Sequence, residues 1–206
     1  MVLHYLQDSR AFRVLWLIEE LGLDCEVVYH RREPRTLRAP AALRHVHPLG
    51  KSPTLEVDGQ VLAESALILT YLATHHGPEW LAPRDSAADW AQQYWLQFAE
   101  GSLMPQLLLQ LVVQKLGVLA WPIRATVAAQ LSLHVAYVAE ALTDRTWFVG
   151  DHITVADVMM SVPIDLAVQR AGLSASSHPA LWQWWQRVQA RPAYQRAHQR
   201  SQQATI

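Results

Sequence analysis

The chain has 206 residues, of which 51% are hydrophobic and 17% charged, so it has enough apolar side chain for one large core or two smaller ones. Seventeen Lys and Arg balance eighteen Asp and Glu, which argues against the basic surface expected of a nucleic-acid-binding protein. The single Cys, at position 25, excludes an internal disulfide and a zinc site built from several cysteines.

The first part of the chain alternates between strand and helix patterns. Apolar runs with turn-forming residues between them predict strands, and apolar residues at spacings of three and four predict helices. In chain order the predicted elements are a strand over 2–6, a helix over 11–21 capped by Gly22, a strand over 26–29, a helix over 40–45, a hairpin over 54–62 that turns at Asp58-Gly59, and a helix over 65–76.

The rest of the chain has helical patterns almost throughout. They cover about 87–116, 122–142, 154–171 and 179–190, with kinks expected at Pro105 and Pro163 and a frayed polar tail after Arg191. We therefore predict two domains, an α/β domain with the order βαβαββα over 1–77 and an all-α helical bundle over 87–206, joined by a linker over 78–86. Thr154 and Asp157 have the spacing of a capping box, which indicates a structural motif rather than a catalytic one.

The most apolar tract, residues 107–121, contains Gln110, Gln114 and Lys115 and is shorter than the roughly 20 residues of a membrane-spanning helix. We interpret it as a core helix. The N-terminal residues lack a basic segment followed by a long apolar one, so a secretory signal is not expected. The expectation is a cytoplasmic protein that binds neither membrane nor nucleic acid.

Three short segments combine residue types that suit a ligand. Ser9, between the first strand and helix, suits a helix N-cap, or its hydroxyl could bind an anion at the positive end of the helix. If the peptide bond before Pro53 is trans, the proline suits the edge of a strand. If the bond is cis, it would turn the Ser52 backbone outward, where that backbone could pair with an extended peptide. Glu64 and Ser65 suit the cap of the next helix. Alternatively, Glu64 could bind the ammonium group and Ser65 the carboxylate of an α-amino acid.

The order of these segments resembles the cytosolic glutathione transferases over nearly the whole chain. The segments that support the resemblance are 9–22, 47–55, 62–72 and 148–157. The resemblance implies a thioredoxin-like first domain, a helical second domain that contributes a hydrophobic substrate pocket, a cis bond before Pro53, and a cytoplasmic homodimer with one glutathione per subunit and a role in detoxification.

The resemblance also implies a role for individual residues. Ser9 would be the catalytic hydroxyl that stabilises the glutathione thiolate, and the glutathione-binding residues would be Lys51, Ser52, Pro53, Glu64 and Ser65. Of these, Lys51 would bind the glycyl carboxylate, the Ser52 backbone the cysteinyl part, and Glu64 with Ser65 the γ-glutamyl end. The hydrophobic electrophile is expected against Leu6, Met104, Leu108 and Trp121, although each of these residues also suits plain core packing.

The Ser9-Arg10 pair resembles serine-type bacterial or fungal members of the family. No cysteine lies near the first helix, and Cys25 is expected to be a buried small hydrophobe. Tyr5 is an alternative hydroxyl, although a strand tyrosine more often faces the core. Trp90, Tyr94 and Trp95 suit either a dimer interface or interior packing.

The predicted function is a glutathione transferase that attacks small hydrophobic electrophiles, without a metal. Two alternatives stay open. One is a glutathione-dependent peroxidase or disulfide reductase, and the other is a non-catalytic ligand carrier or dimerisation module.

Overall fold

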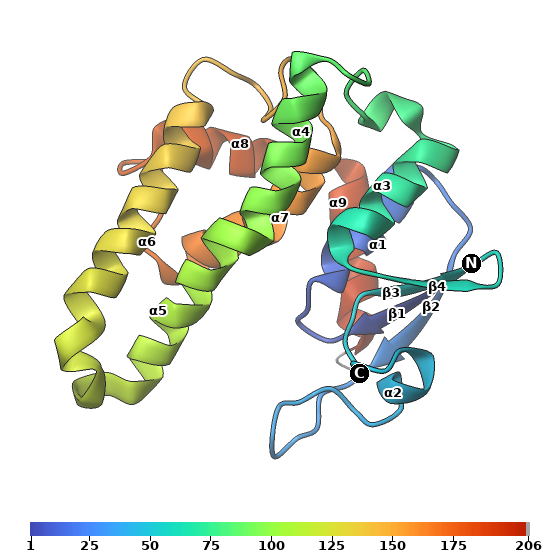
Figure 1. Ribbon diagram of the computed structural model, residues 1–206, viewed down its shortest axis with the longest axis horizontal. Helices are drawn as coiled ribbons and strands as arrows, with labels where there is room; N and C mark the ends of the chain where they lie inside the picture. The colour runs from blue at the N-terminus through green and yellow to red at the C-terminus, as the bar shows by residue number, and fades with distance from the viewer. Residues whose placement is uncertain (205–206) are drawn as a thin grey trace. The chain divides into compact units, whose positions relative to one another are not determined.

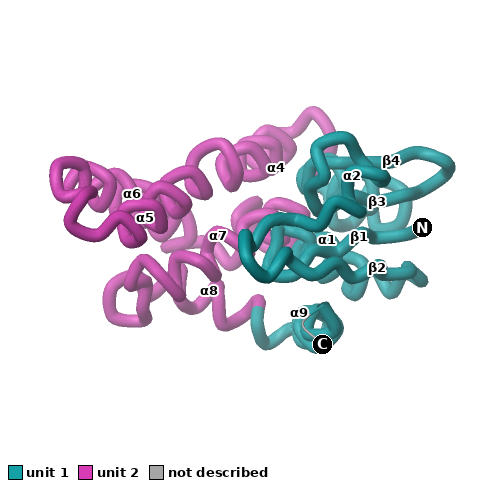
Figure 2. The backbone as a smooth tube through the Cα atoms, turned by 90° about the horizontal axis from the view of Figure 1, so that it is seen from below, with its two compact units in different colours: residues 1–81, 189–206 teal, residues 82–188 magenta. Residues whose placement is uncertain are grey.

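The structure is a computed structural model that describes residues 1–204. It divides into two compact units, shown in Figure 2. One contains Met1–Leu81 and the C-terminal segment that begins at Gln189, and the other contains Ala82–Val188. The predicted second domain covered residues 87–206, so the placement of the C-terminal segment in the first unit was not anticipated.

The first unit is built on a four-stranded mixed sheet with the strand order β2-β1-β3-β4 (Figure 1). Its strands are β1 (Val2–Leu6), β2 (Glu26–His30), β3 (Thr54–Val57) and β4 (Gln60–Ala63). β1 runs parallel to β2 and antiparallel to β3. β3 and β4 form the predicted hairpin, in which Asp58 and Gly59 both have the positive φ that a tight turn of this kind requires.

The helices of this unit are α1 (Ala11–Glu20), α2 (Leu43–Val46), α3 (Ser65–His76) and α9 (Pro192–Ser201), with short 3-10 turns at Pro78–Trp80 and Gln202–Ala204. α1 ends at Glu20, and Gly22, the predicted C-terminal glycine, follows it with a positive φ. The short helix predicted over 40–45 lies later, at Leu43–Val46, because Pro40 to Ala42 form a turn whose carbonyls accept from the next residues.

The frayed tail predicted after Arg191 is wrong, because these residues form α9, which packs on α1. Three arginines of the C-terminal segment bind two glutamates at the end of α1. Arg191 donates to both carboxylate oxygens of Glu20, and Arg196 and Arg200 donate to Glu19 at 2.9 and 2.6 Å. Burial alone would raise the pKa of Glu19, but these arginine hydrogen bonds outweigh it and hold the pKa below its ordinary value.

The second unit is helical in the part that the structure describes, as predicted. Its helices are α4 (Ala87–Phe98), a π-helical turn (Ala99–Leu103), α5 (Met104–Leu116), a 3-10 turn (Gly117–Ala120), α6 (Trp121–Ala141), α7 (Val155–Arg170) and α8 (Pro179–Gln189), which runs to the boundary with the first unit. The irregular turn lies next to Pro105, where a kink was expected. Pro163 lies inside α7.

A buried carboxylate holds the core of this unit together. Asp157 accepts hydrogen bonds from the backbone N–H groups of Phe148 and Thr154 at 3.1 and 3.0 Å and from Trp184 Nε1 at 2.9 Å. The bond from Thr154 completes the predicted capping box at the start of α7. The motif is therefore structural, as the sequence indicated.

The tract over 107–121 is not the buried core helix that was predicted. Leu107 and Val113 are buried, but Leu108, Leu109 and Val112 are exposed along α5, as are most residues of the turn that follows. The apolar pattern was interpreted correctly as a helix and wrongly as an interior one.

Candidate active site

The sheet register brings the three predicted ligand-binding segments of the first unit to the same place. His4 in β1 pairs with Thr54 in β3, and Thr54 pairs with Ala63 in β4. The residues before β3 and those after β4 therefore lie at the carboxyl end of β1, where Ser9 follows. Ligands of α/β sheets commonly bind at the carboxyl ends of parallel strands.

Ser9 lies in the loop between β1 and α1 and is half-buried. Its hydroxyl oxygen accepts the backbone N–H of Ala11 at 3.2 Å, which resembles the capping role considered for it. A hydroxyl has one proton to donate and two lone pairs. The bond from Ala11 uses a lone pair, so the Ser9 O–H can still donate to an anion at the start of α1.

The loop that bears Ser9 is held by Arg32, a residue that the sequence analysis missed. Arg32 donates to the carbonyls of Gln7 and Asp8, both at 2.9 Å, and to that of Leu37 at 3.0 Å. Asp8 has a φ of 48°, which is uncommon for a residue other than glycine. Backbone carbonyls leave no trace in the residue pattern, so no sequence signal pointed to Arg32.

The Ser52–Pro53 peptide bond is cis, which confirms the prediction from the resemblance. The Ser52 hydroxyl accepts the Leu6 N–H at 3.0 Å and donates to the His4 carbonyl at 2.8 Å, so it ties this segment to β1. Within residues 1–204 the Ser52 backbone N–H and C=O have no hydrogen-bond partner. Both groups can therefore pair with an extended peptide.

The N-terminus of α3 is open. Glu64 and Ser65 make no side-chain capping bond, which does not support the capping alternative, and the first bond into the helix runs from the Ile68 N–H to the Glu64 carbonyl. The preceding N–H groups of the first turn, with the buried Ser65, can bind an anion. Glu64 itself is exposed and has a φ of 71°, the kind of strained backbone that clusters at ligand sites.

Lys51 is exposed and follows Gly50, whose φ is 57°. A Cβ atom on Gly50 would lie 2.8 Å from Arg44 Cγ. Glycine is thus required at this turn both for its backbone angle and for the space beside Arg44. The turn sets the direction in which Lys51 and Ser52 leave it.

Two other candidate groups do not compete with Ser9. Tyr5 is buried, and burial raises its pKa to about 12 despite a hydrogen bond with Ser201, so its phenol faces the core as expected. Cys25 is also buried, burial raises the pKa of its thiol, and its Sγ donates to the Glu26 carbonyl at 3.3 Å. A buried thiol with a raised pKa is a poor nucleophile.

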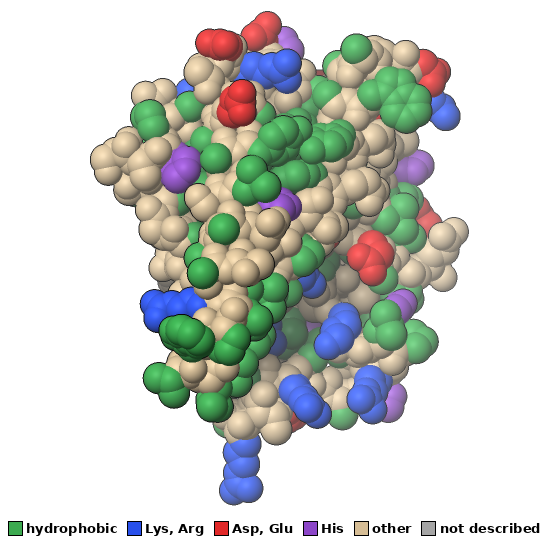
Figure 3. Space-filling view, turned by 60° about the vertical axis from the view of Figure 1, so that its left-hand side comes forward, with side chains coloured by type: hydrophobic (Ala, Val, Ile, Leu, Met, Phe, Trp, Pro, Cys, Tyr) green, Lys and Arg blue, Asp and Glu red, His purple; other side chains and the backbone are tan. Residues whose placement is uncertain are grey.

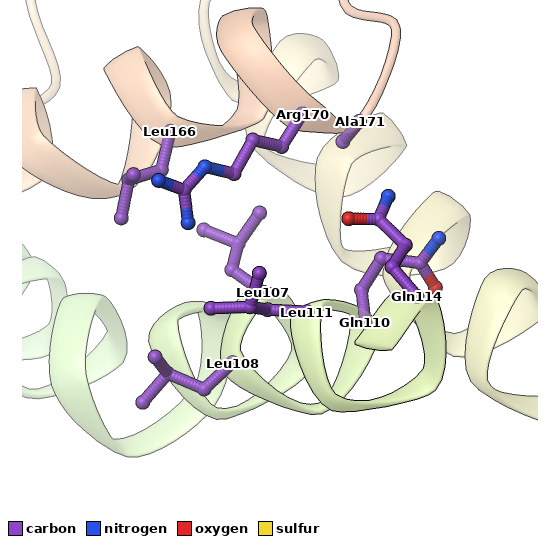
Figure 4. Close-up of a pocket in the computed structure, with 8 residues that line it drawn as sticks. All are labelled: Leu107, Leu108, Gln110, Leu111, Gln114, Leu166, Arg170 and Ala171. Carbon is purple, nitrogen blue, oxygen red and sulfur yellow. The ribbon is translucent and has the colours of Figure 1, made fainter. Parts of the chain in front are cut away.

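The four residues predicted to line a hydrophobic pocket differ in exposure. Leu6 and Met104 are buried, whereas Leu108 is 46% and Trp121 81% exposed. Leu108 also borders a cavity of about 10 Å³ between α5 and α7, shown with its lining residues in Figure 4. This cavity has room for about one water molecule and is too small for a substrate.

The aromatic residues of α4 likewise separate. Trp95 is buried against Phe148, with ring centroids 4.7 Å apart, so it is interior. Trp90 and Tyr94 are exposed and stay candidates for an interface. Among residues 1–204 there is no cluster of three or more His, Cys, Asp or Glu that could hold a metal ion.

The cis-proline loop, the open helix N-terminus and the helical second unit define a class of two-domain proteins, those with a thioredoxin-like domain followed by a helical domain. Residues 9–75 match the glutathione S-transferase N-terminal domain family, and residues 124–192 match the glutathione S-transferase C-terminal domain family. The chain belongs to the glutathione S-transferase family.

Two fungal relatives resemble nearly the whole chain. Glutathione S-transferase 1 of Saccharomyces cerevisiae is 31% identical, over 93% of this chain and 91% of its own. Glutathione S-transferase 3 of Schizosaccharomyces pombe is 32% identical, over 100% of this chain and 89% of its own.

A solved structure of a glutathione S-transferase from Actinobacillus pleuropneumoniae has a TM-score of 0.87 and 32% identity, over 97% of this chain and 92% of that one. A transferase from Methylobacterium radiotolerans, solved in complex with glutathione sulfonate, has a TM-score of 0.78 and 25% identity, over 95% and 93%.

Proposed function

We propose that this family member binds glutathione at the carboxyl end of β1 and uses the Ser9 hydroxyl to stabilise its thiolate for attack on small hydrophobic electrophiles. The observation that supports this most directly is the Ser9 hydroxyl, which accepts the Ala11 N–H and keeps its own proton for donation at the start of α1. The thiol proton would leave to solvent, and the sulfur would form the new bond to carbon as the leaving group departs.

The three binding segments suit the three parts of glutathione. The unpaired backbone of Ser52 would pair with the cysteinyl residue. Ser65 and the open N-terminus of α3 would bind the γ-glutamyl carboxylate, and Glu64 its ammonium group. Lys51, which is exposed, would bind the glycyl carboxylate, and Pro53 would hold the Ser52 backbone outward.

The energetic role of Ser9 is bounded. A free thiol with a pKa of about 8.5 is only a few per cent ionised at pH 7, so complete ionisation raises the rate at most roughly thirtyfold, or about 2 kcal/mol. Positioning of the electrophile must supply the remaining acceleration. We assign that positioning to apolar side chains, with Leu6, Met104, Leu108 and Trp121 as the predicted set.

The family likeness also supports the finer proposals: a serine-type member, a cytoplasmic homodimer, and a role in detoxification. Trp90 and Tyr94, exposed on α4, are the aromatic residues available to a dimer interface. Glutathione-dependent reduction of hydroperoxides would need the same thiolate, so the electrophile distinguishes the two activities.

The test is the pKa of the bound glutathione thiol, followed by ultraviolet absorbance of the thiolate. Ser9→Ala is expected to retain glutathione but to raise this pKa and to lower turnover of a chloronitroaromatic electrophile by about ten- to thirtyfold. Ser9→Thr, which keeps a hydroxyl, is the matched control and should stay near wild type. An unchanged thiol pKa in Ser9→Ala removes Ser9 from the catalytic role, and retention without turnover of any electrophile or hydroperoxide favours a carrier.

A second measurement tests the binding assignment. Ser65→Ala should weaken glutathione binding in calorimetry by about 1–2 kcal/mol, the scale of a hydrogen bond to a charged group. Equal affinity in the variant would contradict the placement of the γ-glutamyl carboxylate at α3.

A further inference from the structure

The hairpin of α5 and α6 ends in a group of exposed apolar side chains. We call this group the hairpin tip, and it consists of Leu116, Val118, Leu119, Trp121 and Ile123. Val118 is 88% exposed, Leu119 78% and Trp121 81%. In Figure 3, hydrophobic side chains gather toward the lower end of the face that is shown. Exposed apolar groups in such a cluster mark an interaction surface.

Buried side chains at the end of the hairpin support the hairpin tip. Val113, Ala120 and Val127 form a small buried cluster at the end of the hairpin. Ala120 is buried between Leu119 and Trp121 in the chain, so the neighbours on both sides are directed outward. The exposure of the tip is therefore a feature of a packed hairpin.

The charged residues that flank the hairpin tip in the sequence are both basic. Lys115 directly precedes Leu116, and Arg124 directly follows Ile123, and both are exposed. Between residues 101 and 139 the sequence contains no Asp or Glu. An apolar tip with a tryptophan and flanking basic residues is the composition of a segment that lies in the interfacial region of an anionic membrane.

We propose that the hairpin tip binds the surface of anionic phospholipid bilayers, with Trp121 and its apolar neighbours among the acyl chains and Lys115 and Arg124 against the phosphates. The binding is interfacial. The helical stretch Ala87–Ala141 is long and apolar enough to cross a membrane by length and composition, but one face of α6, with Val127, Leu131, Val135 and Val138, is buried within its own unit. The polar residues Gln110, Gln114 and Lys115 argue against a helix that crosses the bilayer, but not against a tip that inserts only into its surface. The proposal therefore differs from the expectation that the protein does not bind membranes.

The size of the hairpin tip favours a bilayer over a protein partner. The tip consists of five apolar residues at the end of two helices. A stable protein interface uses about 20–30 residues on each partner, with close shape complementarity. A bilayer needs neither, because each apolar side chain inserts independently.

The experiment is co-sedimentation of the full chain with vesicles of phosphatidylcholine alone or with 30% phosphatidylglycerol, a proportion of about one third chosen for a strong negative surface. The wild type should bind the anionic vesicles, and the double variant Val118→Gln/Leu119→Gln should bind at least tenfold more weakly. Trp121 is left unchanged because it belongs to the set predicted for the electrophile.

Leu133→Gln is the matched control. Leu133 is 62% exposed on the same helix, 12 residues from Trp121 and thus about 18 Å along α6. The Leu133→Gln variant should bind vesicles as strongly as the wild type does. Thermal unfolding and retention on immobilised glutathione, both in the absence of lipid, show whether each variant is folded.

The second pair, Lys115→Gln/Arg124→Gln, tests the charge. It should lower binding to the anionic vesicles and remove most of its dependence on salt. The proposal is overturned if the wild type binds neither vesicle, if the folded tip variant binds as the wild type does, or if Leu133→Gln loses as much. It is also overturned if the tip variant instead changes the oligomeric state without lipid, because the tip would then contact a second copy.

Discussion

The Ser52 hydroxyl donates a hydrogen bond of 2.8 Å to the carbonyl of His4, 48 residues earlier in the chain. The same oxygen accepts the N–H of Leu6. The side chain of Ser52 therefore fixes the loop to β1, and its backbone stays available to a ligand. From the sequence, only the backbone of Ser52 was expected to bind a ligand.

Ser52→Ala should remove both bonds and leave the N–H of the buried Leu6 without its partner. We expect a loss of about 1–2 kcal/mol in the free energy of unfolding and weaker retention on glutathione. Urea denaturation measures the first and calorimetry the second. Ser52→Thr keeps the oxygen and suits an extended segment, so it should recover most of both; a stable Ser52→Ala with wild-type affinity would show that the hydroxyl has no positioning role.

Arg32 binds three carbonyls that belong to two loops. Arg32→Ala should let the loop with Ser9 move, and displacement of a catalytic group lowers the rate strongly, so we expect roughly a tenfold loss in kcat/KM. Arg32→Lys should recover little, since one ammonium group does not reproduce the planar set of donors.

Arg31→Ala is the matched control for charge. Arg31 is exposed, and within residues 1–204 it makes none of these loop contacts. Steady-state kinetics should place Arg31→Ala within about twofold of the wild type, as expected when an exposed surface charge is removed. An equal loss in Arg31→Ala and Arg32→Ala would mean that net positive charge, and not the position of the loop, matters.

Local chemistry made much of the fold predictable. The Asp58-Gly59 turn and the capping box of Thr154 and Asp157 depend on residues close in sequence. Contacts between distant segments left no such pattern. α9 has few apolar residues, and it was interpreted as a tail because Glu19, its partner through Arg196 and Arg200, lies 177 and 181 residues away.

The same limit applies to the candidate site and to exposure. Ser9, Pro53 and Ser65 were proposed as site residues because their residue types suit a ligand, whereas Arg32 acts on backbone carbonyls that are the same in every residue. Periodicity identified α5 as a helix but did not show how much of its apolar surface another element covers.

Gly50 allows a test that separates backbone strain from position. Gly50→Ala must accept a φ of 57° and a Cβ close to Arg44, and both effects displace the segment with Lys51 and Ser52. We expect a loss of about 1–2 kcal/mol in stability and at least a severalfold loss of glutathione affinity.

Gly59→Ala is the control, because Gly59 has a similar φ of 72° but nothing within 4 Å of an added Cβ. The Gly59→Ala variant should also be less stable than the wild type. Its affinity for glutathione, measured by calorimetry, should stay near that of the wild type. If both variants lose affinity equally, general destabilisation explains the effect and Gly50 has no particular role at the site.

The buried Asp157 is expected to make the stability of the protein depend on pH. Burial raises its pKa to about 6, only partly offset by hydrogen bonds from Thr154, Trp184 and Phe148. The folded state therefore keeps the proton to a higher pH than the unfolded state, whose pKa is near 3.8. The contribution of Asp157 to stability is fully present below pH 3.8 and is lost as the pH rises to about 6, by roughly 3 kcal/mol in total.

Other carboxylates act in the opposite direction, since Glu19 has a lowered pKa and loses its contribution as the pH falls. The prediction must therefore be read from Asp157 alone. Carbon-13 NMR of its carboxyl group should give a midpoint near 6. In urea unfolding, the stability of the wild type relative to Asp157→Asn should fall between pH 4 and 6. A midpoint below 4 would show instead that the three donors outweigh burial, and that the carboxylate is held charged in the core.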